Sequence, residues 1–195
     1  MSHGVRLYWI PLGAGGSGFV RWNGRVYEWV QSRLERRTAF DLYHTALQVE
    51  LPEGRFVIET MWPRPDRDGD ARGVVVDGPV FAPWLGFTRV FRYEVRSWRD
   101  GVLPDAGEAV GGPRLVSSDI DVSRAVLDQV ASVPRLVWGR DEADVGDMWN
   151  SNSVVSWLLA RSGIDMDHVS APPGGRAPGW DAGLAVARAN VGSRR

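Results

Sequence analysis

The sequence predicts a segregated α+β fold, with an antiparallel sheet and helices packed on one side of it. The predicted elements run as one helix, several strands and then two helices, whereas a parallel sheet would need strands and helices in alternation. The chain has 195 residues, which is enough for one domain with a substantial core. We therefore expect a single domain over residues 1–195, with an irregular C-terminal arm from about residue 164.

The first half of the chain carries the clearest strand signals. Residues 5–12 predict a strand and residues 13–18 a glycine-rich loop. Apolar spacing favours a helix over residues 24–37, although Asn23-Gly24 is also a hairpin-turn sequence. A hairpin follows, with strands over 42–51 and 55–61 joined by a turn at 52–54. Strict alternation in its first strand places Leu42, His44, Ala46, Gln48 and Glu50 on one face and Tyr43, Thr45, Leu47, Val49 and Leu51 on the other.

The second half of the chain moves from strands to helices. We expect a polar loop at 64–73, strands at 74–76 and 87–98, and a loop over 99–117. Ser118 or Asp119 caps a helix that runs to about residue 131. A further helix covers about 151–161 and ends before Gly163. In the C-terminal arm, Trp180 is expected to anchor the chain against the body, beside a short helix at 181–189.

The composition argues against several classes of partner and site. The net charge is −1, so no overall field attracts nucleic acid, and we expect no nucleic-acid partner. The chain has no cysteine, which excludes disulfides, thiolate zinc sites and cysteine nucleophiles. No two histidines share a ligand spacing, so we expect no metal and no cofactor. The apolar runs are too short to cross a bilayer and no signal peptide is apparent, which favours a cytoplasmic protein.

His44 is the first candidate catalytic residue. It lies inside a predicted strand, where a rigid scaffold would hold a general base, whereas His3 and His168 lie in polar terminal or loop positions. Glu59 on the returning strand would be one diagonal step from His44 and could orient its ring. The alternative for His44 is a structural role, with its ring hydrogen-bonded to backbone. The alternative for Glu59 is a carboxylate paired with an arginine.

Ser151 is the candidate nucleophile. The segment Met148-Trp-Asn-Ser-Asn-Ser153 directly precedes an apolar helix, so Ser151 lies at a helix N-terminus. Free amide groups and the positive end of the helix dipole there would stabilise an alkoxide or an oxyanion. Asn and Ser are also simply good N-capping residues, and this structural explanation stays open.

These residues resemble the circularly permuted papain-like superfamily, which includes NlpC-type amidases, lecithin retinol acyltransferase-like enzymes and PPPDE-like peptidases. The similar segments are residues 42–49 with 56–59, and residues 150–159 at the start of the late helix. The resemblance implies a permuted papain-like fold with His44 as base, Glu59 as orienting group and Ser151 at the nucleophile position. The family usually has cysteine where this chain has Ser151, and serine is much the less acidic group.

Three readings of the function remain open. The first is a hydrolase or acyl transferase that acts on an amide or ester through Ser151, His44 and Glu59. A small-molecule or peptidyl substrate would then lie against Trp62 and Trp149, with Asn150 and Asn152 in the binding site. The second is a catalytically inactive module of the same fold that binds an acyl or peptidyl ligand. The third is a domain of different architecture in which His44 is structural.

Overall fold

A computed structural model describes residues 3–12, 41–63 and 73–192 and confirms the α+β class. Within these ranges the strands form a seven-stranded sheet with the order β4-β5-β3-β2-β1-β6, and β7 pairs with β2 beside this path. The strands are β1 (Gly4–Pro11), β2 (Asp41–Leu51), β3 (Gly54–Met61), β4 (Val74–Pro79), β5 (Arg92–Arg99), β6 (Arg114–Ser117) and β7 (Gly175–Arg176). All pairings are antiparallel except that of β7, which runs parallel to β2.

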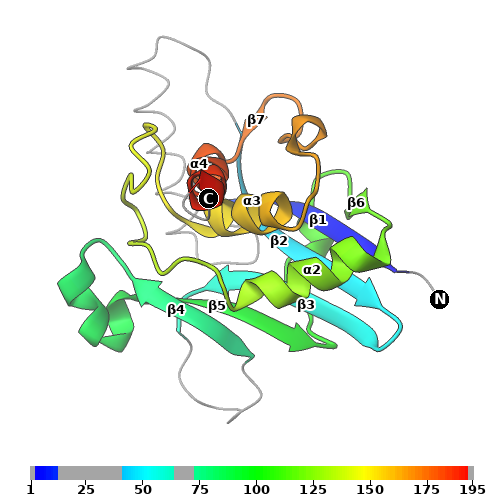
Figure 1. The fold of residues 1–195 in the computed structure, drawn as a ribbon, viewed down its shortest axis with the longest axis horizontal. Coiled ribbons are helices and arrows are strands. Elements are labelled where there is room, and N and C mark those ends of the chain that lie inside the picture. Colours follow the sequence, from blue (N-terminus) through cyan, green and yellow to red (C-terminus); the bar gives the residue numbers. More distant parts are fainter. Residues whose placement is uncertain (1–2, 13–40, 64–72, 193–195) are drawn as a thin grey trace.

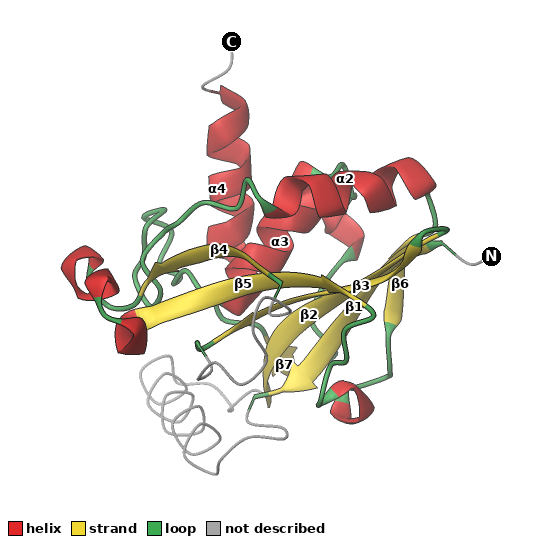
Figure 2. Ribbon diagram, turned by 90° about the horizontal axis from the view of Figure 1, so that it is seen from below, coloured by secondary structure: helices red, strands yellow, loops and turns green. Residues whose placement is uncertain are grey.

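Within the described residues, three α-helices lie on one side of this sheet, the first two in contact with its strands and the last packed on the second (Figures 1 and 2). They are α2 (Ile120–Val130), α3 (Ser151–Arg161) and α4 (Trp180–Gly192). Asp119 caps α2 by accepting hydrogen bonds from the amides of Asp121 and Val122, as the sequence predicts. Helix α3 is buried almost all round, because the sheet lies against one side of it and α4 against another. Within the described ranges, no helix has the length and apolar character that crossing a bilayer requires.

The predicted hairpin strands and turn are confirmed, but the two strands pair over only part of their length and not beside His44. In the β2–β3 ladder Leu51 lies opposite Gly54 and Leu47 opposite Ile58, where the ladder ends. The face of β2 that carries Leu47 and Val49 packs under the helices, in a core that also includes Val5, Leu7, Trp9, Ile58, Tyr93, Trp149 and Leu158. A smaller cluster lies on the second face and contains Tyr8, Ile10, Ala46, Val57 and Leu103.

Three sequence predictions need correction. The strand expected over 87–98 begins only at Arg92, because the sequence from Pro83 turns through the 3-10 helices η2 (Pro83–Phe87) and η3 (Arg89–Phe91). Strand β6 falls in the region expected to be a loop, since four edge residues are too few to produce a recognisable alternation. Helix α4 is longer than expected and makes the C-terminal arm more regular. The loop at 13–18, the helix at 24–37 and residues 64–72 of the predicted loop lie outside the described residues.

The C-terminal arm packs back on the body, and the anchoring role expected for Trp180 is confirmed. The rings of Trp180 and Trp9 are 5.0 Å apart between centroids. The Ser156 hydroxyl on α3 donates to the carbonyl of Trp180. At Gly183 the two helices approach so closely that a Cβ atom would lie 2.2 Å from the Ser153 carbonyl oxygen and 2.1 Å from Ser156 Oγ.

This close approach predicts that Gly183→Ala destabilises the fold. Overpacking against fixed backbone costs about 3 kcal/mol at the upper end, which exceeds the ~1 kcal/mol that alanine gains over glycine in a helix. Urea unfolding should therefore give a lower midpoint for the variant. Gly107→Ala is the matched control, because a Cβ there meets no atom within 4 Å. An equal effect of the two substitutions would contradict the close packing of α3 and α4.

Candidate active site

The segment Asn150–Ser153 opens helix α3 with a capping box. The Asn150 side chain accepts hydrogen bonds from the amides of Asn152 and Ser153, and the Ser153 hydroxyl accepts one from the amide of Asn150. The Ser153 hydroxyl lies near the carbonyl oxygens of Met148 and Gly179, at 3.0 and 2.7 Å. The capping role that the sequence left open for these residues is therefore real for Asn150 and Ser153.

The side chain of Asn152 fastens the start of α3 to strand β2. Its carbonyl oxygen accepts a hydrogen bond from Thr45 Oγ1 at 2.9 Å. Its amide nitrogen donates to the carbonyl oxygens of Tyr43 and Pro178, at 2.9 and 2.8 Å. Tyr43 and Thr45 flank His44, so the first turn of α3 is fixed directly beside the strand segment that carries the candidate base.

Ser151 differs from its neighbours. Among the described residues, its hydroxyl has no hydrogen-bond partner, whereas the side chains of Asn150, Asn152 and Ser153 all make hydrogen bonds. The residue is only 8% exposed. Since Asn150 occupies the amides of Asn152 and Ser153, only the amide of Ser151 itself is left among these three to donate to an oxyanion. An oxyanion at this position would therefore have one backbone N–H donor, whereas the sequence predicts several free amides.

His44 projects from the second face of the sheet. It lies opposite Ile10 in the β1–β2 ladder, and it alternates with Thr45, whose side chain contacts α3. No hydrogen bond joins His44 and Ser151 among the described residues. Burial lowers the pKa of His44 below its usual value, and the negative charge of Asp105 opposes this shift. The ring is consequently neutral at pH 7, which is the state in which it can accept a proton.

The acidic group whose charge raises the pKa of His44 is Asp105, which the sequence did not propose, and the orienting role of Glu59 stays a prediction. Glu59 shares the face of His44, as expected, but it lies opposite Arg96 in the β3–β5 ladder. Asp105 precedes the 3-10 helix η4 (Ala106–Glu108), and both Leu103 and Ala106 pack into the cluster on the second face. The sequence analysis missed Asp105 because it lies in a loop about sixty positions from His44, and no local pattern links the two.

Of the four residues expected to bind substrate, three have structural roles and Trp62 stays a candidate. Trp149 is fully buried, and its indole nitrogen donates to the Tyr93 hydroxyl at 3.2 Å, so it is a core residue and not a pocket wall. Asn150 and Asn152 make the structural hydrogen bonds described above. Trp62 is half exposed and lies 6.1 Å from Trp138 between ring centroids, so it stays a candidate wall.

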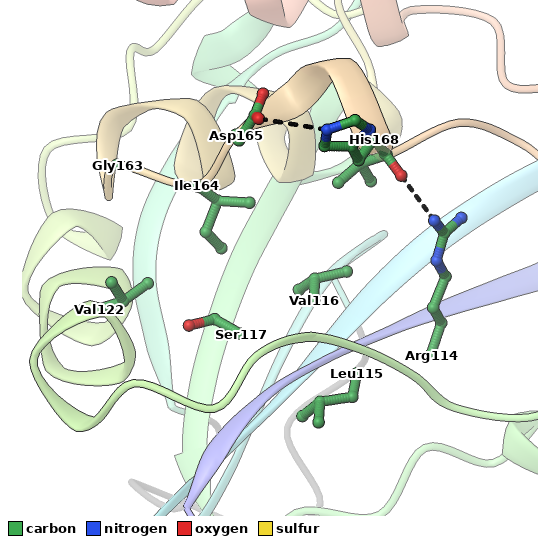
Figure 3. Close-up of a pocket in the computed structure, with 10 residues that line it drawn as sticks. Arg114, Leu115, Val116, Ser117, Val122, Gly163, Ile164, Asp165 and His168 are labelled. Atoms are coloured by element: carbon green, nitrogen blue, oxygen red, sulfur yellow. Dashed lines mark hydrogen bonds and ion pairs between the residues drawn. The ribbon is translucent and has the colours of Figure 1, made fainter.

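A separate pocket of about 320 Å³ lies between β6, the start of α2 and the segment that follows α3 (Figure 3). Apolar side chains such as Leu115, Val122 and Ile164 line it. At its rim Arg114 donates to the carbonyl oxygens of His168 and Ser170, and the His168 ring lies 3.6 Å from the Asp165 carboxylate. The pocket includes none of the residues that the sequence proposed for catalysis. His168 is exposed, as expected for a loop residue.

The lowered pKa of His44 predicts a pH-dependent stability. The unfolded chain binds a proton on His44 below about pH 6.5, whereas the folded chain resists that proton until a lower pH. The free energy of unfolding should therefore fall as the pH drops below about 6.5, and His44→Gln should make this fall shallower. Urea unfolding from pH 7 to pH 5 measures the effect, with the exposed His168→Gln as control. Identical slopes for wild type and His44→Gln would contradict the burial of this ring.

Comparison with known proteins adds no relative. No family model matches the chain, and no curated protein and no solved structure shows significant similarity to it. The resemblance to the permuted papain-like superfamily therefore has no support from such matches. It rests on the residues of the two segments alone.

Proposed function

We propose that this chain cleaves an amide or ester, or transfers its acyl group, with Ser151 as nucleophile and His44 as general base. The observation that carries the proposal is the attachment of Asn152 to Tyr43 and Thr45. It fixes the first turn of α3 against the two residues that flank His44. In the same turn, the hydroxyl of Ser151 is the side-chain group that the surrounding hydrogen bonds leave unused.

Within the described residues, no strand pairs with the β3-facing edge of β2 beside His44, and this supports a path between the two side chains. The β2–β3 ladder ends at Leu47 and Ile58, so β3 does not pair with β2 beside His44. At this edge the side-chain nitrogen of Asn152 donates a hydrogen bond to the carbonyl oxygen of Tyr43. A ring on the second face of β2 and a hydroxyl at the start of α3 would then meet around this edge. A hydrogen bond between them would form when substrate binds, as catalytic hydrogen bonds often tighten only in the complex.

The chemistry would run in two steps. His44 accepts the proton of the Ser151 hydroxyl while the oxygen attacks the carbonyl carbon of the substrate. The amide of Ser151 donates to the oxyanion that forms, and protonated His44 then gives its proton to the leaving amine or alcohol. The acyl group on Ser151 passes next to water or to another acceptor, again with His44 as base. Between these proton transfers Asp105 would stabilise the protonated ring, since its negative charge raises the pKa of His44.

A second candidate function is an inactive module that binds an acyl or peptidyl ligand. It is favoured by the slight exposure of Ser151, at 8%, and by the lack of a described hydrogen bond between Ser151 and His44. The two candidates make opposite predictions for covalent labelling. A binding module would retain a ligand and leave a fluorophosphonate probe unreacted.

Labelling of Ser151 tests the proposed function. A fluorophosphonate should modify Ser151 in the wild-type protein, and peptide mass spectrometry should locate it there. Ser151→Ala should remove the label, and His44→Gln should slow labelling by about 10²–10⁴-fold, because the hydroxyl loses its base. Ser132→Ala, at an exposed serine, is the matched control and should label at the wild-type rate. If folded wild-type protein is not labelled at Ser151, the hydrolase proposal fails and the binding module takes its place.

Substitution of cysteine at position 151 provides an independent test of the pairing. A thiol beside a histidine base should react with iodoacetamide with a pH midpoint below the ordinary value of about 8.5. In Ser151→Cys this midpoint should lie below that value, and in the double variant with His44→Gln it should return towards it. Equal midpoints in the single and double variants would mean that the two side chains do not meet.

Asp105→Asn tests which acid supports the base. Removal of a charge that raises the pKa of His44 should move the ring titration to lower pH, as followed by NMR of the imidazole. The acidic limb of the pH profile of the labelling rate should also move to lower pH. Glu59→Gln and the exposed Glu108→Gln are the comparison variants. A larger shift with Glu59→Gln would restore Glu59 as the orienting residue.

A further inference from the structure

A segment of the C-terminal arm crosses from β2 to the start of α3, and we call its residues 174–179 the strap. The strap includes β7, which pairs with Asp41 and Leu42 of β2 (Figure 2). The amide of Leu12 donates to the carbonyl oxygen of Leu42 on the β1 side of β2, whereas the amide of Asp41 donates to the first carbonyl oxygen of the strap. Successive residues of a strand direct their backbone groups to opposite edges, so the strap lies along the edge of β2 that faces β3.

The second half of the strap contacts the residues on either side of Ser151. The side-chain nitrogens of Asn150 and Asn152 both donate to the carbonyl oxygen of Pro178, each at 2.8 Å. The amide of the residue that follows Pro178 donates to Asp147 Oδ1 at 2.7 Å. One peptide bond of the strap therefore has two donors on its oxygen and a carboxylate on its nitrogen, in the turn that carries the proposed nucleophile.

These contacts are of the kind that would hold the carbonyl group of a peptide substrate. Donors on a carbonyl oxygen orient the group and stabilise an oxyanion that forms there, and pairing with an open strand edge is a general way to bind an extended peptide. Without the strap, the side-chain oxygen of Asn150 would still cap α3, and Asn152 would still bond to Thr45 and Tyr43. One N–H of each side chain would then be open to a substrate.

The composition of the strap favours its release from this position. Ser151 is only 8% exposed, so a substrate needs part of the structure to move before it can reach the hydroxyl. The strap has no large apolar side chain, and lifting it mainly exchanges its hydrogen bonds for bonds to water. Gly174 and Gly179 form its two ends and have φ values of 78° and 94°. Glycine adapts its backbone at low steric cost, which suits the ends of a moving segment.

We propose that the strap is an internal pseudosubstrate, which occupies the position of an extended peptide and covers Ser151 until it lifts. The substrate is then a peptide chain that pairs with the β3-facing edge of β2 and places a carbonyl oxygen between Asn150 and Asn152. This narrows the amides and esters of the proposed function to those of a peptide. The substrate class rests on the function proposed for Ser151, whereas the closure over this side chain does not.

Alkylation of a thiol at position 151 measures the closure independently of catalysis. Iodoacetamide should react with Ser151→Cys at a pH well above the ordinary thiol pKa of about 8.5, where ionisation no longer limits the rate. Adding Gly179→Ala should raise this rate at least about tenfold, because reaction no longer waits for local opening. A Cβ at Gly179 would lie 2.3 Å from Asn150 Oδ1, which two amides of α3 hold in place, so the strap has to move away.

Gly163→Ala, added to the same Ser151→Cys chain, is the matched control. Gly163 also has a left-handed φ, of 83°, but a Cβ there meets no atom within 4 Å. Its alkylation rate should equal that of Ser151→Cys alone, and urea unfolding should show that both glycine variants stay folded. An equal rate with Gly179→Ala and with Gly163→Ala would overturn the closure.

A disulfide that holds the strap in place should have the opposite effect. The chain has no cysteine, so Leu42→Cys/Arg176→Cys can join only these two partners of the β2–β7 ladder. Fluorophosphonate labelling of Ser151 should be at least about tenfold slower in the oxidised than in the reduced protein, because the strap can no longer lift. Each single variant should label equally in both conditions. Equal labelling of the oxidised and reduced double variant would contradict a strap that opens.

Protection by peptides tests the substrate class. The peptide Gly-Gly-Arg-Ala-Pro-Gly, which has the sequence of the strap and is blocked at both ends, should slow the alkylation of Ser151→Cys/Gly179→Ala. The same residues in reverse order should not. Protection by both peptides or by neither would overturn the peptide class. A wild-type protein that a fluorophosphonate does not label would instead remove the proposed nucleophile, and alkylation would still decide whether the strap covers position 151.

Discussion

The side chain of Asn152 is the contact on which the arrangement of the candidate site depends. One amide group joins three parts of the chain, namely the start of α3, strand β2 and the arm that leads into α4. All of its partners are buried or partly buried, so each unmade bond would leave a polar group without water. This requirement fixes the position of α3 along β2 more strictly than apolar packing could, because hydrogen bonds are directional whereas burial of apolar surface is not.

The two faces of the sheet differ in character. The face under the helices is almost wholly apolar and holds the main core. The second face carries His44 together with Glu59, Glu94 and Arg96 on neighbouring strands. Arg96 donates through Nε to Glu94 at 3.0 Å, and both side chains are less than a tenth exposed. A buried pair of this kind offers little net stability over apolar residues, so its presence is consistent with a sheet face that serves binding or chemistry.

The proposed chemistry depends on the boundary between these two faces. His44 belongs to one face of the sheet and Ser151 to the layer above the other face. The proposal therefore requires them to meet where β3 no longer pairs with β2. A continuous sheet at that point would separate base and nucleophile. The side chains beside Ser151 hold the helix in place, and the rigid surrounding that results is what the proposed nucleophile would need.

The sequence alone determined the elements whose signals are local. Alternation fixed the strands of the β2–β3 hairpin and the face that each residue takes, since the opposite assignment would expose Leu47 and Val49. The capping residues and apolar spacing fixed α2 and α3. The tertiary structure alone decided that Trp149 is core, that Asn152 is a structural bridge and that the charge of Asp105 raises the pKa of His44. These are contacts between residues far apart in the chain, and local propensity and periodicity carry no information about which distant partner a side chain will meet.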